Sequence, residues 1–479
     1  MNQEVKYTIL GHACLYVEYK SVRLLIDPWL YGSTYWRSWW NYPKVKENLL
    51  ENIKPTHIYI THLHWDHFHG PSLRKFEKYQ PTIMLPFSCT KRMIVDVKRD
   101  FRFKNILELR HARNYYIGNE FKVTSYQFNP TIIDTSIVLD VNGIKILNAN
   151  DVKVFGTSLD QIIKRHGDFD FVLRSHSSAI QIPNCIANYD SLGLTRSQDD
   201  YSQEFIYFAK KVKAKYSIPF ASSHIYLHRN SIEYNKFYNY PKLVKEKIKK
   251  FNFINPKCLL MPSGSSWSSK NGFSLVDHEY ENIESDIKIY LKENQKKLER
   301  FYALEEKTKV NIMAFENYFS SFFSSLRFIP LKIRFGFYII PNNKEIGVGK
   351  LAIVDFRKRK TNFYEKFSFK EDSLQEEKLD FLITISPKVF NDCNLKPMYN
   401  CWGASKLMKI YLKEKKSLGK YLKFCTLIDL YENDGLPIWR IFSLRQFLIR
   451  LTRWREIIDM FIYFYVIKLK KKPIYYLWK

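Results

Sequence analysis

Residues 61–70, THLHWDHFHG, place four of the chain's twelve histidines beside one aspartate. The run HIYIT before them predicts a strand, and alternation along it would project His62 and His64 to the same side. Two imidazoles at that spacing suit one small divalent ion, and Asp66 and His67 in the following turn can hold a second. Because two close metals can activate a bridging water, the spacing predicts a dinuclear metal centre; histidines that only cap a turn are the alternative.

Composition restricts the class of protein. The 479 residues are 46% hydrophobic and 16% aromatic, which indicates a globular chain with a sizeable core. The formal net charge of +28 favours an anionic substrate or surface, or reflects only a lysine-rich proteome. The absence of a basic low-complexity tail argues against a dedicated nucleic-acid binder. Seven scattered cysteines without zinc-finger or redox spacing, and an N-terminus unlike a signal peptide, predict a cytoplasmic protein.

The histidines also divide the chain into two parts. All twelve lie between His12 and His278, amid short strand patterns separated by turns, including an Asn142-Gly143 hairpin turn. Beyond them come a long helical pattern over 284–307 and strand patterns within 345–356 and 379–386. We therefore predict a metal-binding catalytic domain over 1–275 and a basic, aromatic-rich C-terminal domain over 280–479, either α+β or helical.

The order H-x-H-x-D-H in residues 62–67, directly after a strand, resembles the signature of the metallo-β-lactamase fold. That resemblance implies an α/β sandwich with αββα layers, and it makes Asp151, at the end of IKILNAND, an aspartate that bridges the metals. Residues 5–270 are more closely similar to the metallo-β-lactamase-like part of CMP-N-acetylneuraminate hydroxylases. The similarity implies His228 in SHIYLHRN as the late histidine ligand, with His224 as its competitor. The implied metal ligands are His62, His64, Asp66, His67, Asp151 and His228.

Two departures from that family pattern matter for the chemistry. No histidine lies between the motif and Asp151 in the usual place, where YQFNPTIID offers Asn129 and Asp134; Asp134 is a possible substitute ligand. No cysteine is followed by a histidine in the C-x-H and C-x-x-H pairs of a Rieske cluster. An oxygenase built on this chain would therefore need a separate electron-donor protein.

Several residues outside the motif are candidates for contact with substrate. The segment YWRSWWNYP, residues 35–43, is either a buried aromatic cluster or a wall for a planar group, with Arg37 binding phosphate or carboxylate. We predict Arg37, Trp36 and His176 as substrate-binding residues. For His12 a role in the site and a role in the turn are equally balanced, while His69 is expected to be solvated or to cap a helix.

These observations support three functional hypotheses. The first is a metal-dependent hydrolase of an anionic glycan-, nucleotide- or phosphate-containing substrate, with zinc (two ions) or iron and with Asp66 or Asp151 as proton acceptor. The second is an oxygenase component, and the third is a non-catalytic binding module with a degenerate metal site. The apolar face of the C-terminal tail is predicted to pack on the catalytic domain, with peripheral contact to an anionic membrane as the alternative.

Overall fold

The computed structural model describes the chain from residue 4 to residue 466. The residues that it leaves undescribed within this range are 89, 131–133, 178, 180, 189–197, 251–255, 279, 341–347, 371, 438, 440–442 and 464. Among the described residues, helices fall short of the length and apolar character that crossing a membrane requires.

An eight-stranded sheet contains the first strands of the chain. From one edge to the other its strands are β18 (Gly272–Ser274), β17 (Ser266–Ser268), β1 (Lys6–Ile9), β2 (Leu15–Tyr19), β3 (Val22–Ile26), β6 (His57–Tyr59), β7 (Thr82–Pro86) and β8 (Ile106–Leu109). Strands β3, β6, β7 and β8 are parallel. Their carboxyl ends therefore lie along one edge of the sheet, where the loop that carries the histidine motif begins.

A seven-stranded sheet packs against the first. Its order is β16 (Lys257–Cys258), β14 (Tyr216–Pro219), β13 (Phe171–Arg174), β12 (Ile144–Asn150), β11 (Thr135–Val141), β10 (Phe121–Gln127) and β9 (Asn114–Gly118). The predicted hairpin turn is confirmed, since β11 and β12 pair antiparallel and both Asn142 and Gly143 have positive φ. Asp151 follows β12 at its carboxyl end, next to the parallel strands β13 and β14.

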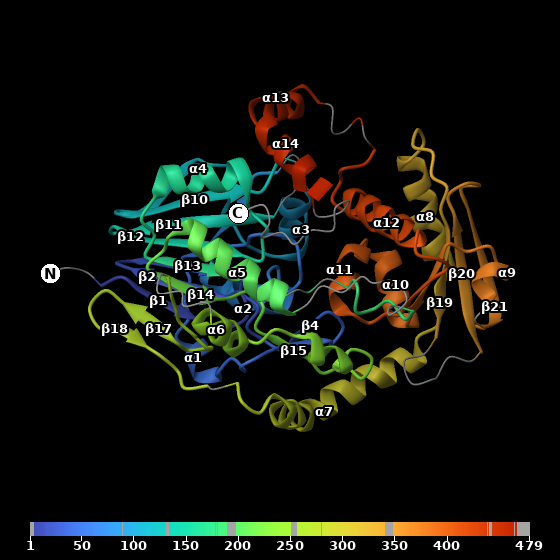
Figure 1. The fold of residues 1–479 in the computed structure, drawn as a ribbon, viewed down its shortest axis with the longest axis horizontal. Helices are drawn as coiled ribbons and strands as arrows, with labels where there is room; N and C mark the ends of the chain where they lie inside the picture. Colours follow the sequence, from blue (N-terminus) through green and yellow to red (C-terminus); the bar gives the residue numbers. More distant parts are fainter. Residues whose placement is uncertain are drawn as a thin grey trace.

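Helices cover the outer face of each sheet, so the layers run helix, sheet, sheet, helix (Figure 1). Apolar side chains from both sheets, such as Tyr7, Ile26, Val123 and Leu173, form the core between them. The covering helices are α2 (Gly70–Phe76) and α3 (Arg92–Asp100) on the first sheet, and α4 (Gly156–His166) and α5 (Gln198–Val212) on the second. This arrangement confirms the predicted αββα sandwich.

A small third sheet lies beside the sandwich. It pairs β4 (Ser33–Thr34) with β5 (Trp39–Asn41) and β5 with β15 (His224–Tyr226). The aromatic segment is therefore fixed next to the start of β15. Short helices α1 (Glu47–Glu51) and α6 (Pro241–Lys250) complete this part of the chain.

The C-terminal part is α+β, as predicted. The 284–307 pattern forms α7 (Ile283–Lys307), which α8 (Ile312–Ser325) follows. A five-stranded sheet orders β21 (Lys360–Ser368), β20 (Val348–Asp355), β19 (Arg334–Ile339), β22 (Phe381–Ile385) and β23 (Ile410–Leu412), with helices α9 (Ser373–Glu376), α10 (Pro387–Leu395), α11 (Tyr399–Ser405) and α12 (Ser417–Glu432). Its apolar core includes Trp36 and Trp39 of the aromatic segment, so the two parts share one cluster of buried side chains.

The chain continues into α13 (Leu444–Thr452) and α14 (Trp454–Tyr463), which return to the sandwich (Figure 1). Helix α14 contacts α4, as expected for a tail that packs on the N-terminal part. The expectation that its apolar face makes this contact is wrong in large part. The contacts include polar ones, such as the Asp459 carboxylate accepting from the Thr157 amide at 2.7 Å, while Ile458, Phe461 and Ile462 are exposed.

Candidate metal centre

One edge of the sandwich collects the predicted ligands because many strands end or begin there. Residues after the carboxyl ends of β1, β3, β6 and β12 are His12, Asp27, the histidine motif and Asp151 respectively. Strands β1 and β3 both pair antiparallel with β2, so they run in the same direction and end at the same edge. Groups far apart in sequence therefore meet in one loop cluster.

The histidine motif itself is a loop. Strand β6 ends at Tyr59, before His62, so the strand alternation that the sequence suggested does not position the two imidazoles. A turn does so instead, because the His64 carbonyl accepts hydrogen bonds from the amides of His67 and Phe68. His62 and His64 still converge, with Nε2 and Nδ1 2.7 Å apart.

The first ligand group consists of His62, His64 and Asp151. The Asp151 Oδ2 lies 3.7 Å from His62 Nε2, and its Oδ1 lies 3.6 Å from His67 Nε2. His62 is buried, but the Asp151 side chain keeps 34% of its surface exposed. This group is therefore accessible from outside and, through Asp151, touches the second.

The second ligand group consists of His12, Asp66 and His67, and all three are buried. The Asp66 Oδ2 is 2.9 Å from His12 Nε2 and 3.2 Å from His67 Nε2. His12 reaches this place because Gly11 lets the hairpin pass close to Asn41, whose Oδ1 accepts from the His12 amide at 2.9 Å; a Cβ on Gly11 would sit 2.9 Å from the same oxygen. The structure thus brings His12 into the site.

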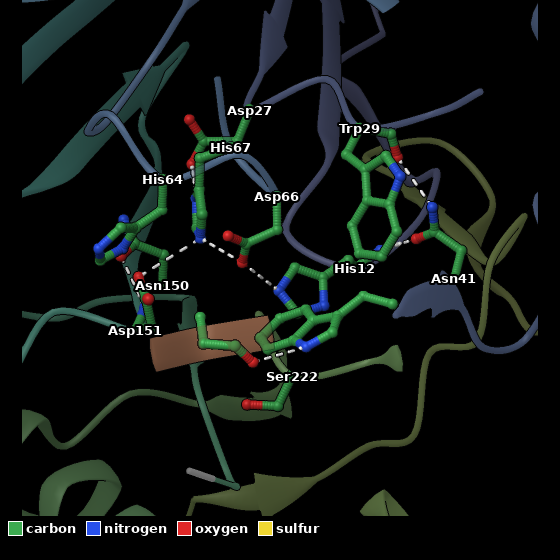
Figure 2. Close-up of polar contacts among 12 residues, drawn as sticks. His12, Asp27, Trp29, Asn41, His64, Asp66, His67, Asn150, Asp151 and Ser222 are labelled. Atoms are coloured by element: carbon green, nitrogen blue, oxygen red, sulfur yellow. Dashed lines mark hydrogen bonds and ion pairs between the residues drawn. The ribbon is translucent and has the colours of Figure 1, made fainter. Parts of the chain in front are cut away.

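Two residues that the sequence analysis did not single out hold the second group in place. The Asp27 Oδ2 accepts from His67 Nδ1 at 2.8 Å, and the same carboxylate binds the amide and hydroxyl of Thr61. The Tyr35 hydroxyl donates to Asp66 Oδ1 at 2.5 Å. Figure 2 shows His67 between Asp27 on one side and Asp66 on the other, with Nε2 turned toward the ligand groups. The Asp27-Pro28 turn was the available signal for Asp27, since it ends a strand at this edge.

Burial and charge set the protonation of the two groups differently. Burial alone lowers the pKa of His67, but the carboxylates of Asp66, Asp151 and Asp27 outweigh it and hold that pKa well above the usual value. Burial lowers the pKa of His62, and the neighbouring His67 lowers it further. Burial raises the pKa of Asp66, but His67 and His12 outweigh it, so the pKa lies well below its usual value.

These donor atoms fit divalent metal ions. His67 Nε2 and Asp151 Oδ1 are buried and make no hydrogen bond within the part of the chain that the structure describes, although buried polar atoms normally do. Imidazole nitrogens and carboxylate oxygens are ligands that zinc and iron accept, and the outer hydrogen bond of His67 to Asp27 is the arrangement common behind metal-bound histidines. His62, His64 and Asp151 would hold one ion, and His12, Asp66 and His67 the other.

The structure places His224, and not the predicted His228, beside His12 of the second ligand group, although neither late histidine is a member of a ligand group. His224 stacks on Trp39 with ring centroids 3.6 Å apart, and its ring lies 5.4 Å from that of His12. Both of its ring nitrogens are buried and make no hydrogen bond to a residue that the structure describes. His228, the favoured candidate, has its Nε2 3.6 Å from Glu305 of α7 and belongs to neither ligand group. The physical reason is that β15 starts at His224 and leads the chain away from the site.

Two further candidates lie near the centre but outside the ligand groups. Half-buried Asp134 precedes β11, and its charge raises the pKa of His62, while burial has the larger, opposite effect. His176 was predicted to bind substrate, but its side chain is 1% exposed and its neighbours include His12 and Tyr238. It therefore cannot contact substrate directly. Burial, together with His12, lowers the pKa of His176 to about 3. His69 is also buried, not solvated, and its Nδ1 contacts the Ser72 hydroxyl at the start of α2.

A cavity of about 830 Å³ lies between the aromatic segment and the C-terminal part. Its lining includes Arg37, Trp36, Trp65, Arg74 and Lys396. The Arg37 guanidinium donates to Ser33 and is half-buried, and burial lowers its pKa.

Tyr35 connects this cavity to the metal centre. Its ring stacks on Trp65 at a centroid distance of 5.7 Å, and its hydroxyl binds Asp66. The buried Tyr35 therefore links the cavity wall to the second ligand group, although no residue of either ligand group lines the cavity.

The chain was compared with known proteins. Residues 6–167 match the beta-lactamase superfamily domain, and this range of the chain contains both the histidine motif and Asp151. Cytidine monophosphate-N-acetylneuraminic acid hydroxylase from Cricetulus griseus is 30% identical over 154 residues, which is 31% of this chain and 27% of that protein. The protein named inactive cytidine monophosphate-N-acetylneuraminic acid hydroxylase from Homo sapiens is 29% identical over 153 residues, 31% of this chain and 30% of that protein. The chain thus spans less than a third of the length of these curated relatives.

Solved structures also resemble the chain. Igni18, a novel metallo hydrolase from Ignicoccus hospitalis, has a TM-score of 0.38 at 14% identity, covering 55% of this chain and 98% of its own. CmlA, a diiron beta-hydroxylase from Streptomyces venezuelae, has a TM-score of 0.38 at 16% identity, covering 56% of this chain and 53% of its own. The predicted resemblance to the metallo-β-lactamase fold is confirmed by the domain match.

Proposed function

We propose that this protein is a metal-dependent hydrolase of an anionic substrate, because residues 6–167 match the beta-lactamase superfamily domain and contain two His/Asp groups that could each hold a metal ion. One observation carries the proposal. His67 Nε2 and Asp151 Oδ1 lie 3.6 Å apart at the junction of the two His/Asp groups, and neither atom makes a hydrogen bond in the described part of the chain. Such an arrangement suits bound cations better than a purely structural network.

The residues of the chain have distinct roles in this proposal. Divalent metal ions, when bound, supply Lewis-acid activation of water and of the attacked bond. Asp27 keeps the Nδ1 proton of His67 in place, so that Nε2 presents its lone pair to the centre. The Tyr35 hydroxyl neutralises part of the charge on Asp66 and fixes its orientation.

Asp151 is the proposed proton acceptor. It is the one carboxylate of the two ligand groups that keeps a sizeable exposed surface, and its two oxygens face His62 and His67. A proton removed from water at the centre has a direct path to this carboxylate. Asp66, the other candidate acceptor, is buried between His12 and His67 and has its second oxygen engaged by Tyr35.

The cavity supports the anionic nature of the substrate. Among the described residues, Arg37 donates to the neutral hydroxyl of Ser33 and not to a carboxylate. Its charge is therefore available to a phosphate or carboxylate group of the substrate. The half-buried Trp65 offers an apolar ring for a base or sugar ring next to Arg37, while Trp36 is buried in the cavity wall. We therefore propose a glycan-, nucleotide- or phosphate-containing substrate whose anionic group binds Arg37 in this cavity.

An oxygenase component is the second candidate. It is favoured by the 30% identity to proteins named as hydroxylases, and it would place iron in the same ligands. Because the sequence has no C-x-H or C-x-x-H pair, such a reaction would need electrons from a separate protein.

Elemental analysis of the full chain, purified without added metal, separates the candidates. Two zinc ions per chain, with hydrolysis of bis(p-nitrophenyl) phosphate, support the hydrolase. Iron with an oxygen-dependent optical change supports the oxygenase. A folded chain that binds no metal contradicts both and leaves a binding module.

Arg37→Ala tests the substrate class within the same assay. We expect kcat/KM for the anionic phosphate ester to fall by about 10- to 100-fold, the equivalent of one charge-assisted hydrogen bond. The neutral p-nitrophenyl acetate should be hydrolysed as before, and metal content should not change. Arg113→Ala, at an exposed arginine directly before β9 and outside the cavity, is the matched control. Equal losses with both esters would contradict the role of Arg37.

A further inference from the structure

The C-terminal helices α13 and α14 present apolar side chains to solvent in a regular pattern. On α13 the exposed residues follow the spacing i, i+3, i+4, i+7, which places them on one face of the helix. On α14 the spacing is i, i+4, i+7, i+8, which again selects one face. The two stripes, here called the apolar face, consist of Leu444, Phe447, Leu448, Leu451, Trp454, Ile458, Phe461 and Ile462, each 44–75% exposed.

The opposite side of α14 is polar and holds the helix to the sandwich. Arg453 donates to the Gln127 side chain at 2.8 Å, and Asp459 accepts from the Thr157 amide at 2.7 Å. Glu456 is buried beside Arg453, with its Oε1 3.6 Å from His111 Nε2. Tyr463 adds an aromatic contact with Phe155, so the inward surface also has an apolar end.

This orientation is the reverse of an ordinary surface helix. An amphipathic helix that serves only a core turns its apolar stripe inward and its charges outward. Here the buried contacts use Arg453, Glu456 and Asp459, and eight large apolar side chains face out. Contiguous exposed apolar surface of this kind marks an interaction site.

The charge of the segment identifies the partner. Residues 440–479 contain ten lysines and arginines but two acidic residues, Glu456 and Asp459. Both acidic residues lie on the inward side of α14, whereas Arg455 is exposed beside the apolar face. An apolar stripe flanked by cations is the pattern that binds an anionic lipid surface, where apolar side chains enter the interface and cations contact headgroups.

We propose that α13 and α14 dock this protein on an anionic lipid bilayer, with the apolar face inserted at the headgroup level. The helices lie on the surface and do not span it, since each is at most ten residues long. Helix α14 packs on α4, which begins five residues after Asp151, so docking would bring this side of the metal domain to the membrane (Figure 1). The proposal does not depend on the reaction that the metal centre performs.

Vesicle sedimentation of the full chain tests the proposal. We expect binding to phosphatidylcholine vesicles that contain 30% phosphatidylserine, weak binding to pure phosphatidylcholine, and at least a tenfold weaker partition for Phe447→Glu/Phe461→Glu. High salt should weaken the binding of the wild-type chain because it screens the contribution of the cations. Ile289→Glu on α7, at a side chain 52% exposed outside the apolar face, is the matched control and should bind like the wild type.

Three results would overturn the proposal. The first is no binding to the anionic vesicles, and the second is binding that Phe447→Glu/Phe461→Glu leaves unchanged. The third, by analytical ultracentrifugation without lipid, is a dimer that the same double substitution dissociates, which would assign the apolar face to a second copy of the chain. Unchanged metal content in the double variant shows that the sandwich is folded, so a loss of vesicle binding can be attributed to the apolar face.

Discussion

The two ligand groups of the metal centre differ in burial and in the hydrogen bonds that support their ligands. His12, Asp66 and His67 are buried, and both Asp66 and His67 have a second hydrogen-bond partner, Tyr35 and Asp27, behind them. The group of His62, His64 and Asp151 is more open: His64 is half-buried, and Asp151 is partly exposed. The closed group is therefore preorganised, while the open group has room for solvent and substrate.

This difference divides the expected roles. A preorganised, buried group binds its ion tightly and exchanges it slowly, because its ligands cannot move independently. A partly exposed group binds more weakly, but it is where substrate reaches the centre. Asp134, in the segment where the resemblance implies a further histidine, is close enough to His62 of the open group for its charge to raise the pKa of that histidine, so this departure from the family pattern lies on the side of the open group.

The largest effect is expected for Asp66→Asn. Removing this charge leaves His12 and His67 buried without their shared carboxylate, and breaking a buried pair costs about 3–5 kcal/mol. We expect affinity for one of the two ions to fall on the order of a thousandfold, with the second ion retained, as measured by elemental analysis after dialysis. Asp160→Asn on α4, at an exposed aspartate, is the control. Two tightly bound ions in Asp66→Asn would remove the distinction between the groups.

A smaller effect is expected for Asp27→Asn, which leaves every ligand in place. The loss of the carboxylate that accepts a hydrogen bond from His67 should lower the affinity for one ion by about 10- to 100-fold, as for other residues that orient a metal ligand. Competition with a chromophoric chelator would resolve this ion from the one in the open group, whose affinity should not change. A uniform loss at both ions would show that Asp27 supports the whole loop.

The pH dependence of metal binding should also separate the groups. Without metal, the pKa of His67 is raised, so at neutral pH a metal ion must displace its proton, and this competition grows as the pH falls. The pKa of His62 is lowered, so proton competition at this ligand of the open group should cost little affinity over the same range. Between pH 7 and pH 6 we expect about a tenfold loss at the closed group. Calorimetry in buffers of different ionisation enthalpy should detect one proton released per ion there; no release would contradict the assignment.

The smallest change in metal affinity is expected for substitutions of the two late histidines, His224 and His228. His224→Ala should weaken the closed group by about tenfold, at the lower end of the range for residues that support a ligand, because its ring packs between Trp39 and His12. His228→Ala should leave metal affinity unchanged and lower the melting temperature, because the buried Glu305 loses one of its partners. The reverse ranking for metal affinity would restore His228 as the ligand.

Much of the architecture could be predicted from the sequence because it depends on local patterns. Strand alternation, the Asn142-Gly143 turn and the amphipathic 284–307 repeat are short-range signals, and each forms the expected element. The motif of residues 62–67 is equally local, so the sequence identified four ligand candidates in one loop. The errors arise where position depends on chain direction: His224 and His228 are four residues apart, and only the course of β15 determines which one meets His12.

The sequence by itself therefore predicted the loop that carries the first ligands, from residue type and spacing, and the αββα fold, from its resemblance to the metallo-β-lactamase fold. Only the tertiary structure decided that His12, Asp27 and Tyr35 join that loop, that His176 is enclosed, and that the apolar stripe of α14 faces outward. The physical reason is that these features depend on which segments distant in sequence come to lie together. Burial, hydrogen-bond partners and the charge environment of a side chain exist only after the sheets have packed.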